Sequence, residues 1–183
     1  MASVDKNEIL KAFPDCTKDP EEVAMALTWW MPKYDINTEK RVDHFLAQIG
    51  HETGGLRWWR ELGGKSYFNK YEPNTSIGKR LGNTVPGDGY KFRGRGVFQL
   101  TGRSNYETMG LKLGLDLVNH PELAEEPFNA VRIACQYWVD KNLNRFADID
   151  DTISITRRIN GGLNGLQDRL KWLKNFSKWV IWG

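Results

Sequence analysis

The sequence predicts a mainly α-helical fold with a small β-hairpin or sheet beside a cleft. Apolar residues recur at helical spacing in the first third of the chain and again after residue 102. The stretch between residues 54 and 96 has no such period and is rich in Gly, Asn, Pro and aromatic residues. No repeat, low-complexity tract or linker divides the 183 residues, so we expect a single domain over residues 1–183.

Capping residues delimit the helices that precede this stretch. Asp19 stands before Pro20, which suits the first position of a helix, and Pro32 ends the apolar run that follows. The next helix is expected to begin near Thr38 and to end at the glycine pair Gly54-Gly55. Later helices are expected at about 103–112, 127–142, 151–159 and 166–182.

The aperiodic stretch is expected to be ordered. A long irregular segment inside a compact domain is usually either functional or disordered, and the many aromatic side chains in residues 54–96 favour order. We expect this segment to form the wall of a cleft, with two or three short strands. The eight tryptophans of the chain fit either a packed core or platforms for sugar rings.

The composition is that of a globular protein. Hydrophobic residues make up 40% and charged residues 27% of the chain, which disfavours disordered and membrane-spanning classes. The net charge of +3 fits an acidic partner such as a bacterial envelope polymer, anionic lipid or nucleic acid, without selecting among them. No apolar signal-peptide core or membrane span is present, so we expect synthesis in the cytoplasm. Cys16 and Cys135 could pair, but two buried thiols are the default expectation.

Glu52 is the first candidate catalytic residue. It lies seven residues beyond Phe45, at the edge of the inward face of the helix expected over 38–53. Partial burial and the negative end of the helix dipole both favour its protonated form. A carboxyl that keeps its proton near neutral pH is what a general acid for glycosidic cleavage requires. The structural alternative is a helix-terminal glutamate paired with Arg57 or Arg60.

Glycoside hydrolysis normally needs a second carboxylate across the sugar, roughly 6.5–9.5 Å from the first in inverting enzymes. Glu61 is the best candidate, because it follows Trp58-Trp59 and precedes the flexible pair Gly63-Gly64 on a separate element. Glu72 and Asp88 in the same stretch are alternatives. Any of the three could instead be a solvated loop carboxylate.

Three ordered motifs give the chain a family resemblance. Residues 92–106, with the sequence FRGRGVFQLTGRSNY, resemble the signature of the glycoside hydrolase family 19 chitinases and their bacteriophage endolysin relatives. His51-Glu52-Thr53 lies upstream and Ile159-Asn160-Gly161-Gly162 lies downstream, so the resemblance spans about residues 40–175. It implies the lysozyme-like or chitinase-like α+β fold of that family and a glycosidase activity.

The resemblance also implies roles for individual residues. Glu52 looks like the general acid, Glu61 like the general base, and Thr101 like the hydroxyl that helps to hold the attacking water. Contacts with the substrate are implied for His51, Gln99, Asn105, Tyr106, Asn160 and Arg169. Arg169 is further expected to tune the carboxylate network, whereas Arg95 is expected to be structural and to satisfy loop carbonyls.

Two features are similar to the bacteriophage lysin branch of the family. Only nine residues separate Glu52 from Glu61, fewer than in plant members, and two cysteines cannot reproduce the several disulfides of the plant enzymes. This shifts the expected substrate from chitin to peptidoglycan. Ser104 stands where the plant pattern has an aromatic residue, so the contact made there is open.

The last expected helix, 166–182, is basic and amphipathic. Its apolar face carries Leu170, Leu173, Phe176 and Val180, while Lys171, Lys174 and Lys178 lie largely elsewhere. We expect residues 166–176 to close the core and the end, Trp179–Trp182, to be partly exposed. A basic amphipathic end of this kind suits contact with lipopolysaccharide or an anionic outer membrane.

Together these observations predict an endolysin-type muramidase. It would hydrolyse the β-1,4 bond between N-acetylmuramic acid and N-acetylglucosamine with inversion, as a monomer without metal or cofactor. We expect it to remain in the host cytoplasm until it is released to the periplasm and cell wall. The alternatives are a chitinase of the same fold, a non-catalytic sugar-binding module, and a membrane-active or nucleic-acid-binding basic protein, although no nucleic-acid partner is expected.

A zinc amidase or peptidase is disfavoured. The only histidines are His44, His51 and His120, and the His51-Glu52-Thr53 motif is not followed by a second histidine at helical spacing.

Overall fold

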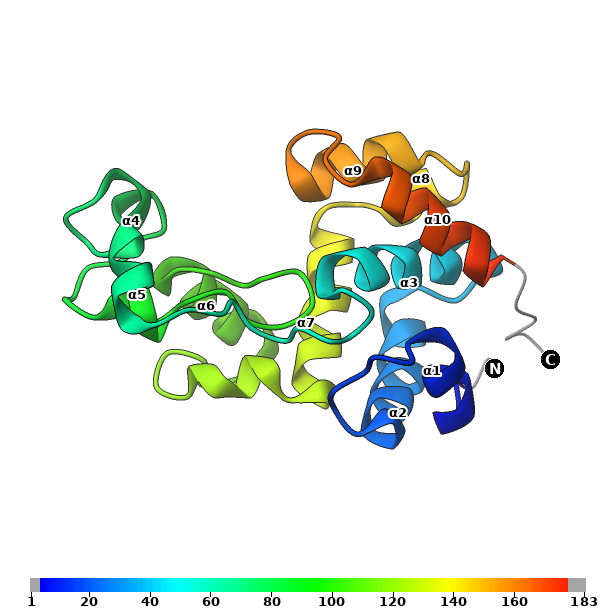
Figure 1. Cartoon of the computed structure of the whole chain (residues 1–183), viewed down its shortest axis with the longest axis horizontal. Helices are drawn as coiled ribbons and strands as arrows, with labels where there is room; N and C mark the ends of the chain where they lie inside the picture. Colours follow the sequence, from blue (N-terminus) through cyan, green and yellow to red (C-terminus); the bar gives the residue numbers. More distant parts are fainter. Residues whose placement is uncertain (1–3, 178–183) are drawn as a thin grey trace.

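The computed structural model describes residues 4–177, which form two lobes on either side of one helix (Figure 1). The larger lobe contains α1 (Lys6–Ala12), α2 (Pro20–Trp30), α3 (Glu39–Thr53), α8 (Asn144–Ala147), α9 (Thr152–Asn160) and α10 (Leu166–Phe176). The smaller lobe contains α4 (Ser76–Arg80), α5 (Asp88–Lys91) and α6 (Arg103–Leu113). The helix α7 (Pro127–Asp140) runs between the lobes, and the 3₁₀ helices are η1 (Met31–Tyr34), η2 (Lys65–Tyr71) and η3 (Pro121–Glu125). The mainly helical fold is therefore confirmed.

Local sequence explains where the two best predicted helices begin and end. The Asp19 side chain accepts a hydrogen bond from the backbone N–H of Glu21, which caps α2, and the chain then tightens into η1 at Met31. Thr38 caps α3 in the same way, and α3 ends at Gly54, whose φ of 59° is a left-handed conformation that favours glycine. Both boundaries agree with the prediction, and α3 delivers Glu52 in its last turn.

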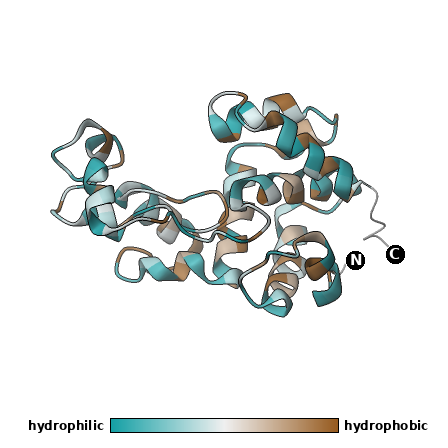
Figure 2. Ribbon diagram, in the orientation of Figure 1, coloured by the Kyte–Doolittle hydropathy of each residue, from teal (hydrophilic) through white to brown (hydrophobic). Residues whose placement is uncertain are grey.

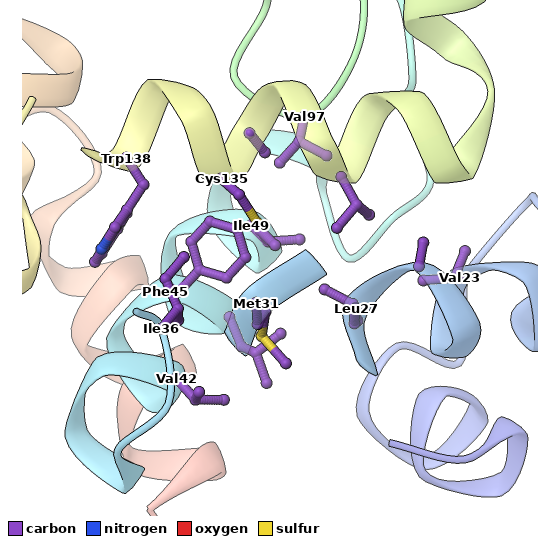
Figure 3. Close-up of a cluster of buried hydrophobic side chains, with 14 of the residues drawn as sticks. Val23, Leu27, Met31, Ile36, Val42, Phe45, Ile49, Val97, Cys135 and Trp138 are labelled. Atoms are coloured by element: carbon purple, nitrogen blue, oxygen red, sulfur yellow. The ribbon is translucent and has the colours of Figure 1, made fainter. Parts of the chain in front are cut away.

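The main core lies where α2, α3 and α7 meet (Figure 3). Leu27 of α2, Phe45 of α3 and Trp138 of α7 are all buried there, and the rings of Phe45 and Trp138 meet edge to face with centroids 5.3 Å apart. A second cluster under α6 is built on Phe92 and Tyr106. Hydrophobic and hydrophilic residues are mixed in both lobes (Figure 2), and Leu56 and Val97, from the two segments that lead into the smaller lobe, belong to the main core.

The small sheet expected between residues 54 and 96 is reduced to two isolated antiparallel bridges, Arg60 to Arg95 and Arg95 to Leu100. Gly96 and Gln99 both have positive φ, 77° and 52°, so the chain turns back within a few residues and no longer ladder forms. The rest of the stretch is ordered as η2, α4 and α5. The bridges hold the segment after α3 against the segment before α6, side by side as in Figure 1.

The last helix packs on α3, but its inward face differs from the expected one. Arg169 and Phe176 are buried, and Trp172 lies over Gly50 and packs on Phe13 with ring centroids 5.5 Å apart. Leu170, expected on the apolar face, is 38% exposed. The prediction was wrong for Leu170 because the face of α10 that packs on α3 contains the buried Arg169. A pattern of apolar residues cannot reveal a buried arginine. Val180 and Trp179–Trp182 lie outside the described residues.

Two remaining expectations concern the thiols and membrane segments. Cys16 and Cys135 are both free, and only Cys135 is fully buried, so the expectation of two buried thiols holds for one of them. Within residues 4–177, no helix combines the length and the apolar character needed to cross a bilayer.

Candidate active site

Glu52 is held from behind by a buried arginine. Arg169, near the start of α10, places Nη2 at 2.6 Å from Oε1 of Glu52 and donates through Nη1 to the side-chain oxygen of Gln48. Gln48 and Glu52 are one helical turn apart on α3, so a single guanidinium spans both. Arg169 and Gln48 are fully buried, and the Glu52 side chain is 22% exposed. One oxygen of Glu52 is thus fixed, and the carboxyl lies at the edge of the protein.

Arg169 was expected from the family resemblance to tune the carboxylate network, and it contacts Glu52 directly. The structural alternative was wrong about the partner, because Arg57 pairs with Asp15 at 3.3 Å and Arg60 with Glu125 at 3.7 Å. Glu52 is therefore both paired and accessible.

Tyr137 of α7 is a neighbour of Glu52 that sequence reasoning missed. Burial, and then the negative charge of Glu52, raise the pKa of Tyr137 to about 12. Its phenol therefore stays protonated at any working pH and remains able to donate a hydrogen bond. The Tyr137 ring packs on Phe98, with centroids 5.1 Å apart, and Phe98 belongs to the turn between the bridge partners Arg95 and Leu100.

Glu61 lies on the segment that pairs with this same turn. Its backbone N–H donates to the carbonyl of Gly94 at 2.7 Å, and its Oε2 accepts from the N–H of Gly94 at 3.4 Å. The other oxygen, Oε1, accepts from the Tyr71 hydroxyl at 2.9 Å and from Lys70 Nζ at 3.3 Å. The Glu61 side chain is 21% exposed, so it too lies at the edge of the protein.

Gly94 brings together the groups predicted around the second carboxylate. A Cβ atom at Gly94 would collide with the side-chain oxygen of Gln99 and would lie 3.2 Å from the Thr101 hydroxyl. Because Gly94 has no side chain, the Gln99 amide and the Thr101 hydroxyl can lie beside its backbone, to which Glu61 is hydrogen-bonded. Glu61, Gln99 and Thr101 therefore converge on one glycine.

The two alternative carboxylates have structural partners. Glu72 accepts from the backbone N–H groups of Gly87 at 2.8 Å and Gly89 at 3.0 Å. Asp88 is 2% exposed and pairs with Arg103 at 2.6 Å. Burial alone would raise the pKa of Asp88, but hydrogen bonds from Arg103 and two backbone N–H groups outweigh it and lower that pKa. Both carboxylates are held by partners within the smaller lobe, and Glu61 remains the candidate for the second carboxylate.

Two of the residues expected to contact substrate are buried instead. Tyr106 is fully buried, donates to the carbonyl of Arg93 at 2.7 Å and accepts from Arg95, so it presents no surface to a substrate in this structure. Arg169 is also fully buried and reaches the site only through Glu52 and Gln48. The role in the carboxylate network fits this position, whereas direct contact with substrate does not.

The other expected contacts lie nearer the surface. His51 is bonded through Nδ1 to Asp168 at 2.8 Å and lies over Gly165, so it joins α3 to the start of α10. Asn160 is exposed, and the exposed Asn105 donates to the carbonyl of Thr101 at 2.7 Å. Gln99 and Thr101 are half-buried.

Arg95 is structural, as expected. It is 4% exposed, pairs with Glu125 at 2.6 Å and donates to the carbonyl of Lys91 at 2.7 Å. It therefore fixes the chain around Gly94 from inside the protein.

Among residues 4–177, no cluster of three or more histidine, cysteine, aspartate or glutamate side chains is suited to a metal ion.

The described tryptophans divide between core and surface: Trp59 and Trp138 are buried, whereas Trp58 and Trp29 are 46% and 53% exposed. Trp58 follows Glu52 closely in sequence and lies against Gly54, so it is the exposed indole nearest to the candidate acid along the chain.

The fold places Glu52 on α3 and Glu61 on a separate segment, both with partly exposed side chains, and two such carboxyl groups suit glycoside hydrolysis. The family model described as chitinase class I, that of glycoside hydrolase family 19, matches residues 23–163. A Haemophilus influenzae protein described as a glycosyl hydrolase family 19 domain-containing protein is 34% identical over 185 residues, which cover 88% of this chain and 89% of that protein. The chain belongs to glycoside hydrolase family 19.

Chitinases are similar in both sequence and fold. Endochitinase 2 of Gossypium hirsutum is 34% identical over 112 residues, and the match covers 57% of this chain but only 37% of that protein. The crystal structure of chitinase C from Streptomyces griseus HUT6037 superposes with a TM-score of 0.75 at 23% identity and covers 98% of this chain and 93% of the other. At that identity the likeness establishes the shared fold, which agrees with the expected chitinase-like architecture.

Proposed function

We propose that this family 19 glycosidase is an endolysin-type muramidase, which hydrolyses the β-1,4 bond between N-acetylmuramic acid and N-acetylglucosamine in peptidoglycan. The convergence of Glu61, Gln99 and Thr101 on Gly94 is the observation that carries the proposal. It supplies a carboxylate, a hydroxyl and an amide around one point, while Glu52 comes from a separate helix.

The proposed reaction uses these groups in one displacement. Glu52 gives its proton to the glycosidic oxygen, and the leaving sugar departs with a free hydroxyl. Glu61 removes a proton from a water molecule that Thr101 helps to hold, and the water oxygen bonds to the anomeric carbon from the opposite face. The product sugar is inverted at that carbon. The chemistry needs only two carboxylates and water, so we expect full activity in the presence of a metal chelator. We also propose that the enzyme acts as a monomer.

Two sequence features favour peptidoglycan as the substrate. Glu52 and Glu61 are only nine residues apart, and the chain has two cysteines, both free in the described structure. Both features resemble the lysin branch of the family. A chitinase is the second candidate, and the Gossypium hirsutum and Streptomyces griseus relatives favour it by their names.

Purified peptidoglycan and purified chitin distinguish the two candidates. Each polymer is incubated with the wild-type protein and with Glu52→Gln, and new reducing ends are counted. The proposal expects release from peptidoglycan that Glu52→Gln abolishes, and mass spectrometry of the fragments to show N-acetylmuramic acid at the new reducing end. Release from chitin alone would assign the chain to the chitinases.

The basic C-terminal segment is proposed to act on the outer membrane. Lys171 and Lys174 are exposed on α10, and the segment continues with Lys178 beyond the described residues. A cationic end can displace the counterions of lipopolysaccharide and give a protein released from the cytoplasm access to the wall.

Truncation after Ser177 tests this role and leaves the buried Phe176 in place. We expect the truncated protein to lose permeabilisation of intact Gram-negative cells and to hydrolyse purified peptidoglycan normally. Equal loss of both activities would point to a role in folding instead.

A further inference from the structure

The two oxygens of Glu61 have very different surroundings. Oε1 accepts two hydrogen bonds from η2, from the Tyr71 hydroxyl at 2.9 Å and from Lys70 Nζ at 3.3 Å. Within residues 4–177, Oε2 has one hydrogen bond, the long contact of 3.4 Å with the N–H of Gly94. The strongly held oxygen is therefore on the η2 side, and the weakly held one is on the side of Gly94, where Thr101 lies.

Both donors are themselves held in place. The Lys70 ammonium lies 3.7 Å from the ring centroid of Tyr67 and 4.7 Å from that of Tyr71, which suits cation–π contacts. The Tyr71 carbonyl accepts from the side-chain amide of Asn83 at 2.7 Å, and the oxygen of that amide accepts from the backbone N–H of Arg103 at 2.8 Å. Tyr71 is thus tied to the start of α6, and its hydroxyl has little freedom to leave Glu61.

The protonation states of Tyr71 and Lys70 favour donation of hydrogen bonds to Glu61. Burial, and then the hydrogen bond to Glu61, raise the pKa of Tyr71, so its hydroxyl keeps its proton. The pKa of Lys70 is raised as well: burial alone would lower it, but the hydrogen bonds with Tyr67, Tyr71 and Glu61 outweigh that effect. A phenol and an ammonium that both stay protonated stabilise an ionised carboxylate.

We propose that Tyr71 and Lys70 are positioning residues for Glu61: they anchor Oε1, so that Oε2 faces Thr101 and takes the proton from water. This inference rests on the proposed function, because it gives Glu61 the role of general base. Neither residue touches the substrate in this account, and each acts through Glu61.

Tyr71→Phe removes one donor and keeps the ring. We expect kcat on peptidoglycan to fall roughly tenfold with KM unchanged, because a hydrogen bond to a charged group is lost only from the base. The matched control is Tyr90→Phe, which removes a phenol from a ring that packs on the same Phe68 as Tyr71 does.

Lys70 provides a second test on a more exposed residue, with 37% of its side chain accessible. Lys70→Gln should lower kcat in the same way with KM unchanged, and Lys70→Arg, which keeps a cation that can donate to Oε1, should restore kcat. A fall in kcat accompanied by a rise in KM of similar size, or no recovery in Lys70→Arg, would overturn the inference.

Failure of the inference can be told apart from failure of the proposed function. If Glu61→Gln is inactive on peptidoglycan while Tyr71→Phe and Lys70→Gln behave as wild type, only the positioning role is wrong. If Glu61→Gln keeps wild-type activity, the role of Glu61 as base is wrong, and this inference falls with it.

Discussion

The guanidinium of Arg169 on α10 lies 2.6 Å from the carboxylate of Glu52 on α3, and the arginine is fully buried. The catalytic candidate is therefore fixed by a helix from the far end of the chain. That contact makes the proposed acid sensitive to the packing of α10 on α3.

Removing the arginine should destabilise the protein. Arg169→Met leaves Glu52 and Gln48 without their cation in a mostly buried position, so we expect the free energy of unfolding to fall by about 3 kcal/mol. Urea denaturation measures it. The matched control is Arg57→Met, whose pair with Asp15 is about half exposed and should contribute less than about 1 kcal/mol. Equal losses in the two variants would contradict the structural role of Arg169.

A methyl group at Gly94 should affect activity more than folding. In Gly94→Ala the new Cβ displaces the Gln99 amide and crowds the Thr101 hydroxyl, so kcat/KM should fall by at least about tenfold while the far-UV circular dichroism is unchanged. Gly64→Ala is the matched control, because its φ is −71° and no atom lies within 4 Å of the new Cβ. Full activity in Gly94→Ala would show that the convergence at this glycine is not needed.

Asp43 should give the protein a pH-dependent stability. Burial, followed by the negative charges of Glu39 and Asp150, raises the pKa of Asp43 to about 6. His44 and Lys174 line the same hollow, and neither makes a hydrogen bond or ion pair with Asp43.

A carboxyl with a raised folded-state pKa stabilises the fold below its unfolded pKa, and this contribution is lost as the pH rises through about 6. Asp43→Asn should therefore raise the free energy of unfolding by about 2 kcal/mol at pH 8 and change it little at pH 3.5. Thermal denaturation at both pH values measures this. A stabilisation of equal size at both values would rule out titration of Asp43 as the cause.

Trp58 should act as a sugar platform near the proposed acid. Its indole is 46% exposed, so Trp58→Ala is expected to raise KM for peptidoglycan fragments about tenfold with a smaller change in kcat. Trp29→Ala is the control, because that indole is also exposed but lies on α2, under the ammonium of Lys33 at 3.8 Å. Similar KM values for the two variants would remove Trp58 from the binding surface.

Local sequence signals were sufficient for the bounds of α2 and α3 and for the position of Glu52 on α3. Caps such as Asp19 and Thr38 and the terminator Gly54 are local signals, so they placed α2 and α3 correctly. The apolar period of α3 placed Glu52 at the edge of the inward face. A helix that begins and ends on strong local signals needs little tertiary information.

Contacts between distant segments could not be predicted in the same way. The family resemblance implied a role for Arg169 in the carboxylate network, but no local pattern marked its contact with Glu52. Tyr137 lies near Glu52 and Tyr71 contacts Glu61 from other elements, and neither residue was predicted at the site. The small sheet failed as a prediction because turns at Gly96 and Gln99 interrupt it.

The most direct measurement is the release of reducing ends from purified peptidoglycan by Glu52→Gln. The glutamine keeps an oxygen that can accept from Arg169, so the variant should fold, and circular dichroism verifies this. Glu107→Gln, an exposed change on α6, is the matched control. We predict a fall in rate of about 10²–10⁴-fold for Glu52→Gln and none for the control. A folded Glu52→Gln protein that releases reducing ends at the wild-type rate would contradict the assignment of Glu52 as the proton donor.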